Sequence, residues 1–175
     1  GNVISTPDVQ SGVGKLGLPY TTTARTIPNF TLVSTPVNAN GVFTSGPQTV
    51  TYVYRRSDAG NVTVYHKSVY DNSDLSSPTV LDGTRKLGLP YTTSPESYAD
   101  FEVSSVPANA NGTFASGAQT VTYLYKRKQS GGVRVNYLDN HGNSIETPDD
   151  ITGTENVGLP YTTSPKTIPY YDLIT

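Results

Sequence analysis

The sequence predicts a mainly β protein, α+β at most, built from tandem copies of one small module. β-branched and aromatic residues, including 13 tyrosines, dominate the apolar set, and these residue types favour strands. No window keeps the 3.6-residue apolar period of an amphipathic helix for more than about two turns. Several short motifs also recur at a nearly constant offset, which is the mark of a repeat protein.

The repeat is clearest in the corner motif Gly-Leu-Pro-Tyr-Thr-Thr, which occurs at Gly17–Thr22, Gly88–Thr93 and Gly158–Thr163. The offsets between these copies are 71 and 70 residues. Two further segments, Asn38–Gly41 and Gln48–Tyr54, also return 71 residues later. Because separate motifs share one offset, chance similarity is excluded and the unit of repetition is a module of this length.

Polar segments at 55–61 and 126–132, which contain basic residues and Gly, precede matching strands and mark the module boundaries. We therefore predict a first module at 1–57 that lacks its opening strand and a complete module at 58–128. A third module at 129–175 lacks its C-terminal part. Because a missing strand leaves a sheet position open, we expect only the middle module to form its sheet completely.

The first strand of a module is predicted at Val62–Val64 and at Val133–Tyr137, where Val and Tyr alternate with polar residues. In the third copy, Asp139–Asn143 supplies a hairpin turn because Asn and Gly tolerate positive φ, and a short strand follows at 144–146. The corner motif is predicted to be a structural corner at which a single helical turn starts, with Pro near its first position.

Two later strands complete the module. One is predicted at 30–33 and 101–103, before the Asn-Ala-Asn-Gly turns of the first two copies, and at the equivalent 171–174 of the third. The last strand, Gln119–Tyr125, alternates most clearly, since Val121, Tyr123 and Tyr125 share one face. We expect this strand to lie inside the sheet rather than at its edge.

The motifs follow one another in a fixed order over nearly the whole chain. They read Val-x-Val-x-Tyr, Asp-x-x-Gly-Asn, Gly-x-Pro-Tyr-Thr-Thr, Ile-Pro-x-Tyr/Phe, Asn-x-x-Gly-x-Phe and Gln-Thr-Val-Thr-Tyr-x-Tyr-Lys/Arg. This succession resembles the mucin-binding-protein (MucBP) repeat of Gram-positive bacterial surface adhesins. The resemblance implies β-grasp (ubiquitin-like) modules in an elongated rod, on an extracellular, cell-wall-anchored parent protein. The middle copy departs from the pattern at His66, where the third copy has Tyr137, and at 98–100, where Tyr-Ala-Asp replaces Ile-Pro-x.

Composition excludes several functions. The chain has no Cys and hence no disulfide or thiolate site, and its net charge of −2 provides no basic field for nucleic acid. No apolar run approaches about 18 residues, so we expect no membrane insertion by this segment. His66 and His141, the only histidines, occupy non-equivalent positions, and no oriented base is evident. Asp and Asn side chains between 139 and 150 could offer oxygen atoms to Ca²⁺, but they do not follow the pattern of a twelve-residue Ca²⁺-binding loop. We predict no enzyme, no metal site and no cofactor.

Ligand-binding residues are predicted at two kinds of position. Aromatic rings can stack on sugars, and one recurs in each corner motif: Tyr20, Tyr91 and Tyr161. Basic side chains at the junctions can pair with sialate or sulfate; they are Arg55, Arg56, Lys126, Arg127 and Lys128. The other interpretation is that the tyrosines pack inside their modules and the cations belong to a solvated linker.

Two main functions remain open. The resemblance implies a monomeric adhesin segment whose repeats bind host mucin glycoproteins and glycans by weak multivalent contacts. Alternatively, the repeats are a structural spacer that projects a separate adhesive domain from the cell wall. An accessory module of an enzyme is a third option. If the junction cations bind acidic glycans, binding must weaken as salt is added.

Overall fold

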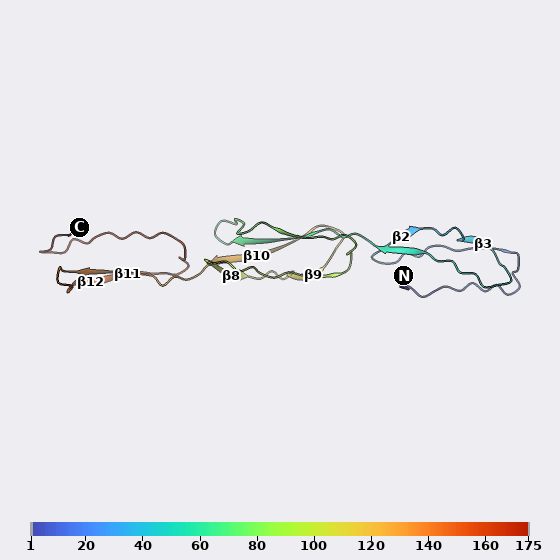
Figure 1. Cartoon of the computed structure of the whole chain (residues 1–175), viewed down its shortest axis with the longest axis horizontal. Coiled ribbons are helices and arrows are strands. Elements are labelled where there is room, and N and C mark those ends of the chain that lie inside the picture. Colours follow the sequence, from blue (N-terminus) through green and yellow to red (C-terminus); the bar gives the residue numbers. More distant parts are fainter. Residues whose placement is uncertain (1, 175) are drawn as a thin grey trace. The chain divides into compact units, whose positions relative to one another are not determined.

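The computed structural model describes residues 2–174, and among them it places twelve strands and no helix (Figure 1). The strands are β1 (Pro19–Thr21), β2 (Phe30–Ser34), β3 (Asn40–Val42), β4 (Val53–Arg56), β5 (Val62–Ser68), β6 (Thr79–Leu81), β7 (Pro90–Thr92), β8 (Phe101–Ser105), β9 (Asn111–Thr113), β10 (Gln119–Arg127), β11 (Val133–Leu138) and β12 (Ser144–Ile151). Across this range no helix is long and apolar enough to span a membrane. The predicted mainly β class is confirmed.

The described chain divides into two compact units. The first runs to Thr63 and adds Val80–Thr92 and Asn111–Thr120. The second takes Val64–Thr79, Thr93–Ala110 and the described residues from Val121 onward. Each junction between consecutive repeats therefore falls inside one unit, the first junction in the first unit and the second junction in the second unit.

The largest sheet has four strands in the order β6-β5-β10-β8. β8 is antiparallel to β10. β5 and β10 run parallel, because the Gln119 N–H donates to the Asn61 carbonyl near their beginnings and the Val69 N–H donates to the Tyr125 carbonyl near their ends. The last strand of the middle repeat therefore lies inside its sheet, as the alternation predicted.

The core of this sheet comes from alternate positions of its two central strands. The buried side chains on β5 and β10 are Val62, Val64, His66, Ser68, Val121, Tyr123 and Tyr125. This period of two is the one that a pleated strand imposes on a sheet with one buried face. Full burial of each large apolar side chain stabilises the fold by roughly 1.5–3 kcal/mol. The predicted shared face of β10 is thus confirmed as core.

Four smaller sheets contain two strands each, in the pairs β1-β3, β2-β4, β7-β9 and β11-β12. In the pair β7-β9, Tyr91 lies opposite Gly112, and in β1-β3 Tyr20 lies opposite Gly41. A Cβ atom on Gly112 would lie 2.6 Å from the Tyr91 hydroxyl oxygen, and one on Gly41 would lie 2.8 Å from that of Tyr20. Glycine is therefore required because the tyrosine ring covers the backbone.

The last Thr of the corner motif fastens the corner to the opposite turn. The Thr22 hydroxyl donates to the Ala39 carbonyl at 2.9 Å and lies 2.9 Å from the Tyr52 hydroxyl. Thr93 makes both contacts at the equivalent place in the middle repeat. These hydrogen bonds explain why the motif combines Tyr with Thr: the ring covers glycine while the hydroxyl joins two distant segments.

Two of the predicted local structures are wrong, and a third is confirmed. The helical turn predicted at the corner motif is wrong, because Pro19 and Pro90 begin strands whose backbone bonds go to the opposite strand. The strand predicted at 171–174 is also wrong, since its described backbone joins no ladder. The hairpin turn at Asp139–Asn143 is confirmed between β11 and β12, with Gly142 at φ 85°. The β-grasp relation and the rod arrangement stay predictions.

Candidate functional site

The first repeat junction is held by one arginine and two backbone hydrogen bonds. Arg56 Nη1 donates to the Leu87 carbonyl at 2.8 Å, and its guanidinium carbon lies 4.8 Å from the ring centre of Phe30. The Ser57 N–H donates to the Asn29 carbonyl at 2.9 Å, and the Leu87 N–H donates to the Ser57 carbonyl at 3.2 Å. The linker is therefore bonded both to the repeat before it and to the one after it.

The second junction repeats this arrangement with the equivalent residues. Arg127 Nη1 donates to the Val157 carbonyl at 2.9 Å, and its guanidinium carbon lies 5.0 Å from the ring centre of Phe101. The Lys128 N–H donates to the Asp100 carbonyl at 2.9 Å, and the Val157 N–H donates to the Lys128 carbonyl at 3.3 Å. Two of the arginines predicted to bind ligand thus hold consecutive repeats together.

The other predicted cations have differing surroundings. Lys126 lies 3.2 Å from a carboxylate oxygen of Glu102 and 3.6 Å from one of Glu155. The hydrogen bond with Glu102, followed by the charges of both carboxylates, raises the pKa of Lys126. Lys128 donates to two backbone carbonyls in the loop before β8, at 2.9 and 2.8 Å. The Arg55 side chain is exposed on β4.

The three equivalent tyrosines each lie in their own repeat and differ in exposure. Tyr91 is only 5% exposed, and its ring centre lies 5.4 Å from that of Phe114. Tyr20 is half-buried, and its ring centre lies 5.5 Å from that of Phe43. Tyr161 is 64% exposed and presents its ring to solvent. The assignment of these tyrosines and of the junction cations to ligand binding stays a prediction.

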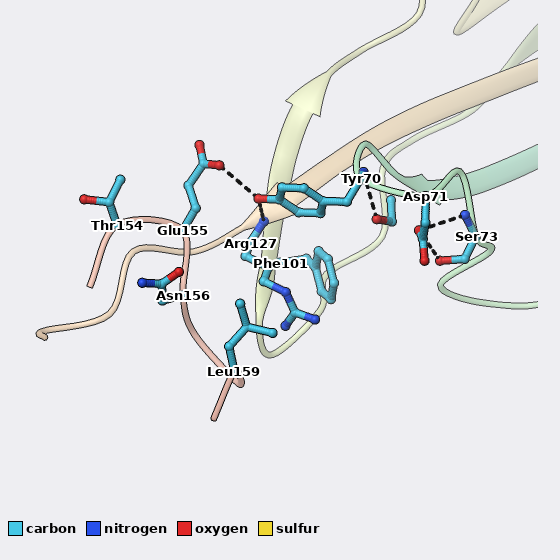
Figure 2. Close-up of a pocket in the computed structure, with 10 residues that line it drawn as sticks. Tyr70, Asp71, Ser73, Phe101, Arg127, Thr154, Glu155, Asn156 and Leu159 are labelled. Carbon is cyan, nitrogen blue, oxygen red and sulfur yellow. Dashed lines mark hydrogen bonds between the residues drawn. The ribbon is translucent and has the colours of Figure 1, made fainter. Parts of the chain in front are cut away.

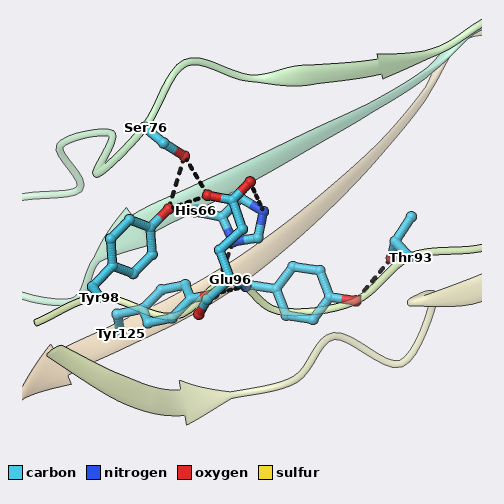
Figure 3. Close-up of polar contacts among 7 residues, drawn as sticks. His66, Ser76, Thr93, Glu96, Tyr98 and Tyr125 are labelled. Atoms are coloured by element: carbon cyan, nitrogen blue, oxygen red, sulfur yellow. Dashed lines mark hydrogen bonds and ion pairs between the residues drawn. The ribbon is translucent and has the colours of Figure 1, made fainter.

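A polar cluster that the motifs did not reveal lies in the second unit (Figure 3). His66 is 2% exposed; its Nδ1 lies 2.8 Å from the Tyr125 hydroxyl oxygen and its Nε2 lies 3.6 Å from a Glu96 carboxylate oxygen. Glu96 accepts hydrogen bonds from the hydroxyls of Tyr98 at 2.7 Å and Ser76 at 3.0 Å. The cluster joins the central strands to the loop before β8.

Burial and hydrogen bonding fix the charges in this cluster. Burial raises the pKa of Tyr98 to about 12 and shifts the pKa of Tyr125 in the same direction. The hydrogen bonds from Tyr98 and then Ser76 lower the pKa of Glu96. At neutral pH the tyrosines are therefore neutral donors and Glu96 is an anionic acceptor. Because His66 and Tyr125 are almost fully covered, a reactant cannot reach the imidazole, and the arrangement supports folding of the loop.

Two acidic residues of the third repeat, Asp139 and Asp149, have partners within that repeat. The Asp139 carboxylate accepts the N–H groups of His141 and Asn143, and the contacts with Asn143 are the largest cause of its lowered pKa. Asp149 lies 2.6 Å from the Lys166 ammonium. Between residues 2 and 174, no three His, Cys, Asp or Glu side chains are arranged to hold a metal ion.

A cleft of about 530 Å³ opens at the second junction, entirely within the second unit (Figure 2). It lies among the loop after β5, the start of β8, the end of β10 and the segment 154–159. Its walls are Ser68, Tyr70, Asp71, Ser73, Phe101, Arg127, Thr154, Glu155, Asn156 and Leu159. The volume falls within the roughly 300–1,000 Å³ of small-molecule sites, and the walls combine rings with hydrogen-bonding groups.

Comparison with known proteins gives consistent matches along the chain. The family model described as MucBP domain matches residues 1–55, 61–126 and 132–175. Internalin J of Listeria monocytogenes serovar 1/2a (strain ATCC BAA-679 / EGD-e) is 38% identical over 166 residues, which cover 93% of this chain and 19% of that protein. Internalin J of Listeria monocytogenes serotype 4b (strain F2365) is 37% identical over 164 residues, which cover 91% of this chain and 18% of that protein. The chain thus spans about a fifth of the length of these curated relatives.

Proposed function

Because the chain belongs to the MucBP domain family, we propose that it is a bacterial adhesin segment whose repeats bind host mucin-type glycoproteins by weak multivalent contacts. Family membership and the similarity to Internalin J indicate an adhesin-like repeat protein of the bacterial surface. The observation that carries the proposal is the tandem array itself, with three matched segments in one chain. Linked copies turn weak individual contacts into strong overall attachment.

The proposed organisation follows the repeats, at 1–57, 58–128 and 129–175, on a cell-wall-anchored parent protein. We propose a monomeric rod, and the two matching junctions support it. Arg56 and Arg127 make the same pair of contacts, so one repeat passes to the next by the same local geometry.

The predicted binding residues divide by their surroundings. Exposed Tyr161 and Arg55 are proposed to contact glycan directly. Arg56 and Arg127 would act on binding through the geometry of the junction. Buried Tyr91 and half-buried Tyr20 would act through the shape of their repeats. No catalytic step is proposed, because the one buried imidazole is covered by its neighbours.

The spacer function is the second candidate, and the repeated junction favours it. Hydrogen bonds of the same kind join consecutive repeats at both junctions, and a spacer requires such joints whether or not the repeats bind anything. In that case adhesion would belong to another part of the parent protein.

Retention on immobilised mucin separates the two functions. The full chain and chains of one, two and four complete repeats are passed over purified mucin and over an unglycosylated protein as control. The adhesin proposal expects dissociation from mucin to slow steeply with repeat number. If no chain is retained, the spacer function is supported. A salt series shows whether exposed cations such as Arg55 contribute, because their contacts with acidic glycans weaken as salt rises.

A further inference from the structure

We infer that the cleft at the second junction binds a neutral sugar residue, a hexose or an N-acetylhexosamine, so that two consecutive repeats build one glycan site. This rests on the proposed function and specifies its ligand and its place. The lining residues come from both sides of the junction: Tyr70 and Phe101 precede the segment 126–132, Arg127 lies in it, and Glu155 and Asn156 follow it. A single repeat cannot supply both walls.

The walls are held in place by their own contacts. The Tyr70 hydroxyl accepts the Arg127 backbone N–H at 3.1 Å and donates to Glu155 Oε2 at 3.0 Å (Figure 2). The Arg127 side chain meanwhile donates to the Val157 carbonyl. Because these side chains are ordered before any ligand arrives, little conformational entropy is lost on binding.

The lining groups suit the two kinds of surface that a sugar presents. Tyr70 is 51% exposed and Leu159 is 47% exposed, so apolar surface is open to the C–H face of a pyranose ring. The Glu155 carboxylate is an acceptor for sugar hydroxyls. The Asn156 amide donates to the Thr152 carbonyl at 3.0 Å and keeps its own oxygen as an acceptor. The Asn156 amide can also pair with the amide of an N-acetyl group, because each has both a donor and an acceptor.

The charges around the cleft give no preference for acidic sugars. Arg127 is the only Lys or Arg among its lining residues, and it is accompanied by the carboxylates of Asp71 and Glu155. The Ser73 hydroxyl and backbone N–H lower the pKa of Asp71, so this group is anionic at neutral pH. Lys126 lies just outside the lining, 3.6 Å from a carboxylate oxygen of Glu155, so the two carboxylates are balanced by two cations. A sialate or sulfate therefore gains no net electrostatic attraction in this cleft, and each cation already has an acceptor.

The first junction provides an internal control. It keeps the arginine contact through Arg56, but Arg85 and Lys86 stand at the positions of Glu155 and Asn156. The acceptors for sugar hydroxyls are replaced there by cations. The arginine and linker contacts thus recur at the first junction, whereas the acceptors after the linker do not, and the wall supplied by Tyr70 has no equivalent in this sequence.

The test is a nuclear magnetic resonance titration of the full chain with N-acetylgalactosamine, galactose and N-acetylneuraminic acid, each to about 50 mM, which covers millimolar affinities. We expect the two neutral sugars to shift amide signals at 68–73 and 154–159 and to leave 84–89 unchanged. Asn156→Lys, which introduces the residue of the first junction, should weaken this binding at least about tenfold. Lys86→Ala should not, and both variants should keep dispersed spectra.

The possible results separate the cleft inference from the adhesin proposal. If no sugar shifts the cleft signals, or if N-acetylneuraminic acid shifts them as strongly as the neutral sugars, the inference is overturned. If mucin retention persists while the cleft signals stay unchanged, the proposed function stands and this site does not. If neutral sugars bind in the cleft but wild-type chain ignores mucin, the site stands and the adhesin proposal fails.

Discussion

Replacing Arg127 with methionine should loosen the second junction while both adjoining repeats stay folded. In the native chain the guanidinium donates to the Val157 carbonyl at 2.9 Å and lies 5.0 Å from the ring centre of Phe101. Methionine keeps an aliphatic chain against Phe101 but removes the charge and the donor. The perturbation is therefore confined to the contact that joins one repeat to the next.

The magnitude follows from the two interactions that the methionine cannot make. A hydrogen bond to a charged group contributes about 1.5–3 kcal/mol, and an exposed cation–π interaction contributes about 0.5–1 kcal/mol. Arg127 is only half-buried, and the freed carbonyl can bind water, so we take about 1–2 kcal/mol for the whole destabilisation. Because 1.4 kcal/mol is a factor of ten in an equilibrium constant, the junction should open about 5- to 30-fold more often.

Amide hydrogen exchange measures this opening directly. The Val157 N–H, which donates to the Lys128 carbonyl across the junction, should exchange about 5- to 30-fold faster in the variant. The Leu87 N–H at the first junction should be unchanged, and Arg56→Met should give the reverse pattern. Unchanged exchange at Val157, or equal acceleration at both junctions, would refute the arginine's role as a local inter-repeat contact.

Three further predictions concern the middle repeat. Gly112→Ala should lower its stability by about 1–3 kcal/mol, because the new Cβ would meet the Tyr91 hydroxyl, whereas Gly117→Ala meets nothing within 4 Å and should be neutral or slightly stabilising. Equal thermal midpoints for these two variants would contradict the packing argument. The pKa of Glu96 is lowered from 4.5, so its stabilising contribution is present above that value and is lost as pH falls through the folded-state pKa. The thermal midpoint should therefore decline more steeply under acid in the native chain than in Glu96→Gln. The pKa of Tyr98 is raised to about 12, so ultraviolet titration of Tyr98→Phe should lose a late tyrosinate step.

The strands that sequence located best were those with a clear period of two. Val133 and Tyr137 face the covered side of β11 as alternation predicted, and the buried set on β10 was identified in full. Both predictions succeed because residue spacing along a pleated strand decides which face a side chain occupies. The junctions were located for a similar reason, since their polar, Gly-containing composition is a local property.

The contacts of the candidate sites could not be predicted in this way. The sequence marks His66 only as a replacement for the tyrosine of the third copy, because its partners Tyr125 and Glu96 lie 59 and 30 residues away in the chain. Arg127 was recognised as a junction cation, but its acceptor is a backbone carbonyl, and every residue type carries one. The cleft is lined by residues from separate segments, and none of these segments carries a sequence motif that indicates a cleft.

Identical sequence has different outcomes in two copies of this module. Gln-Thr-Val-Thr-Tyr forms strand at 119–123 but not at 48–52, and Val121 and Tyr123 are buried where Val50 and Tyr52 are only half-buried. Sequence alone determined the unit of repetition, its β character and the side of each strand that is apolar, because these are properties of residue order. The tertiary structure decided which of those segments became strands, because a strand exists only when its backbone N–H and C=O groups bond to a neighbouring one.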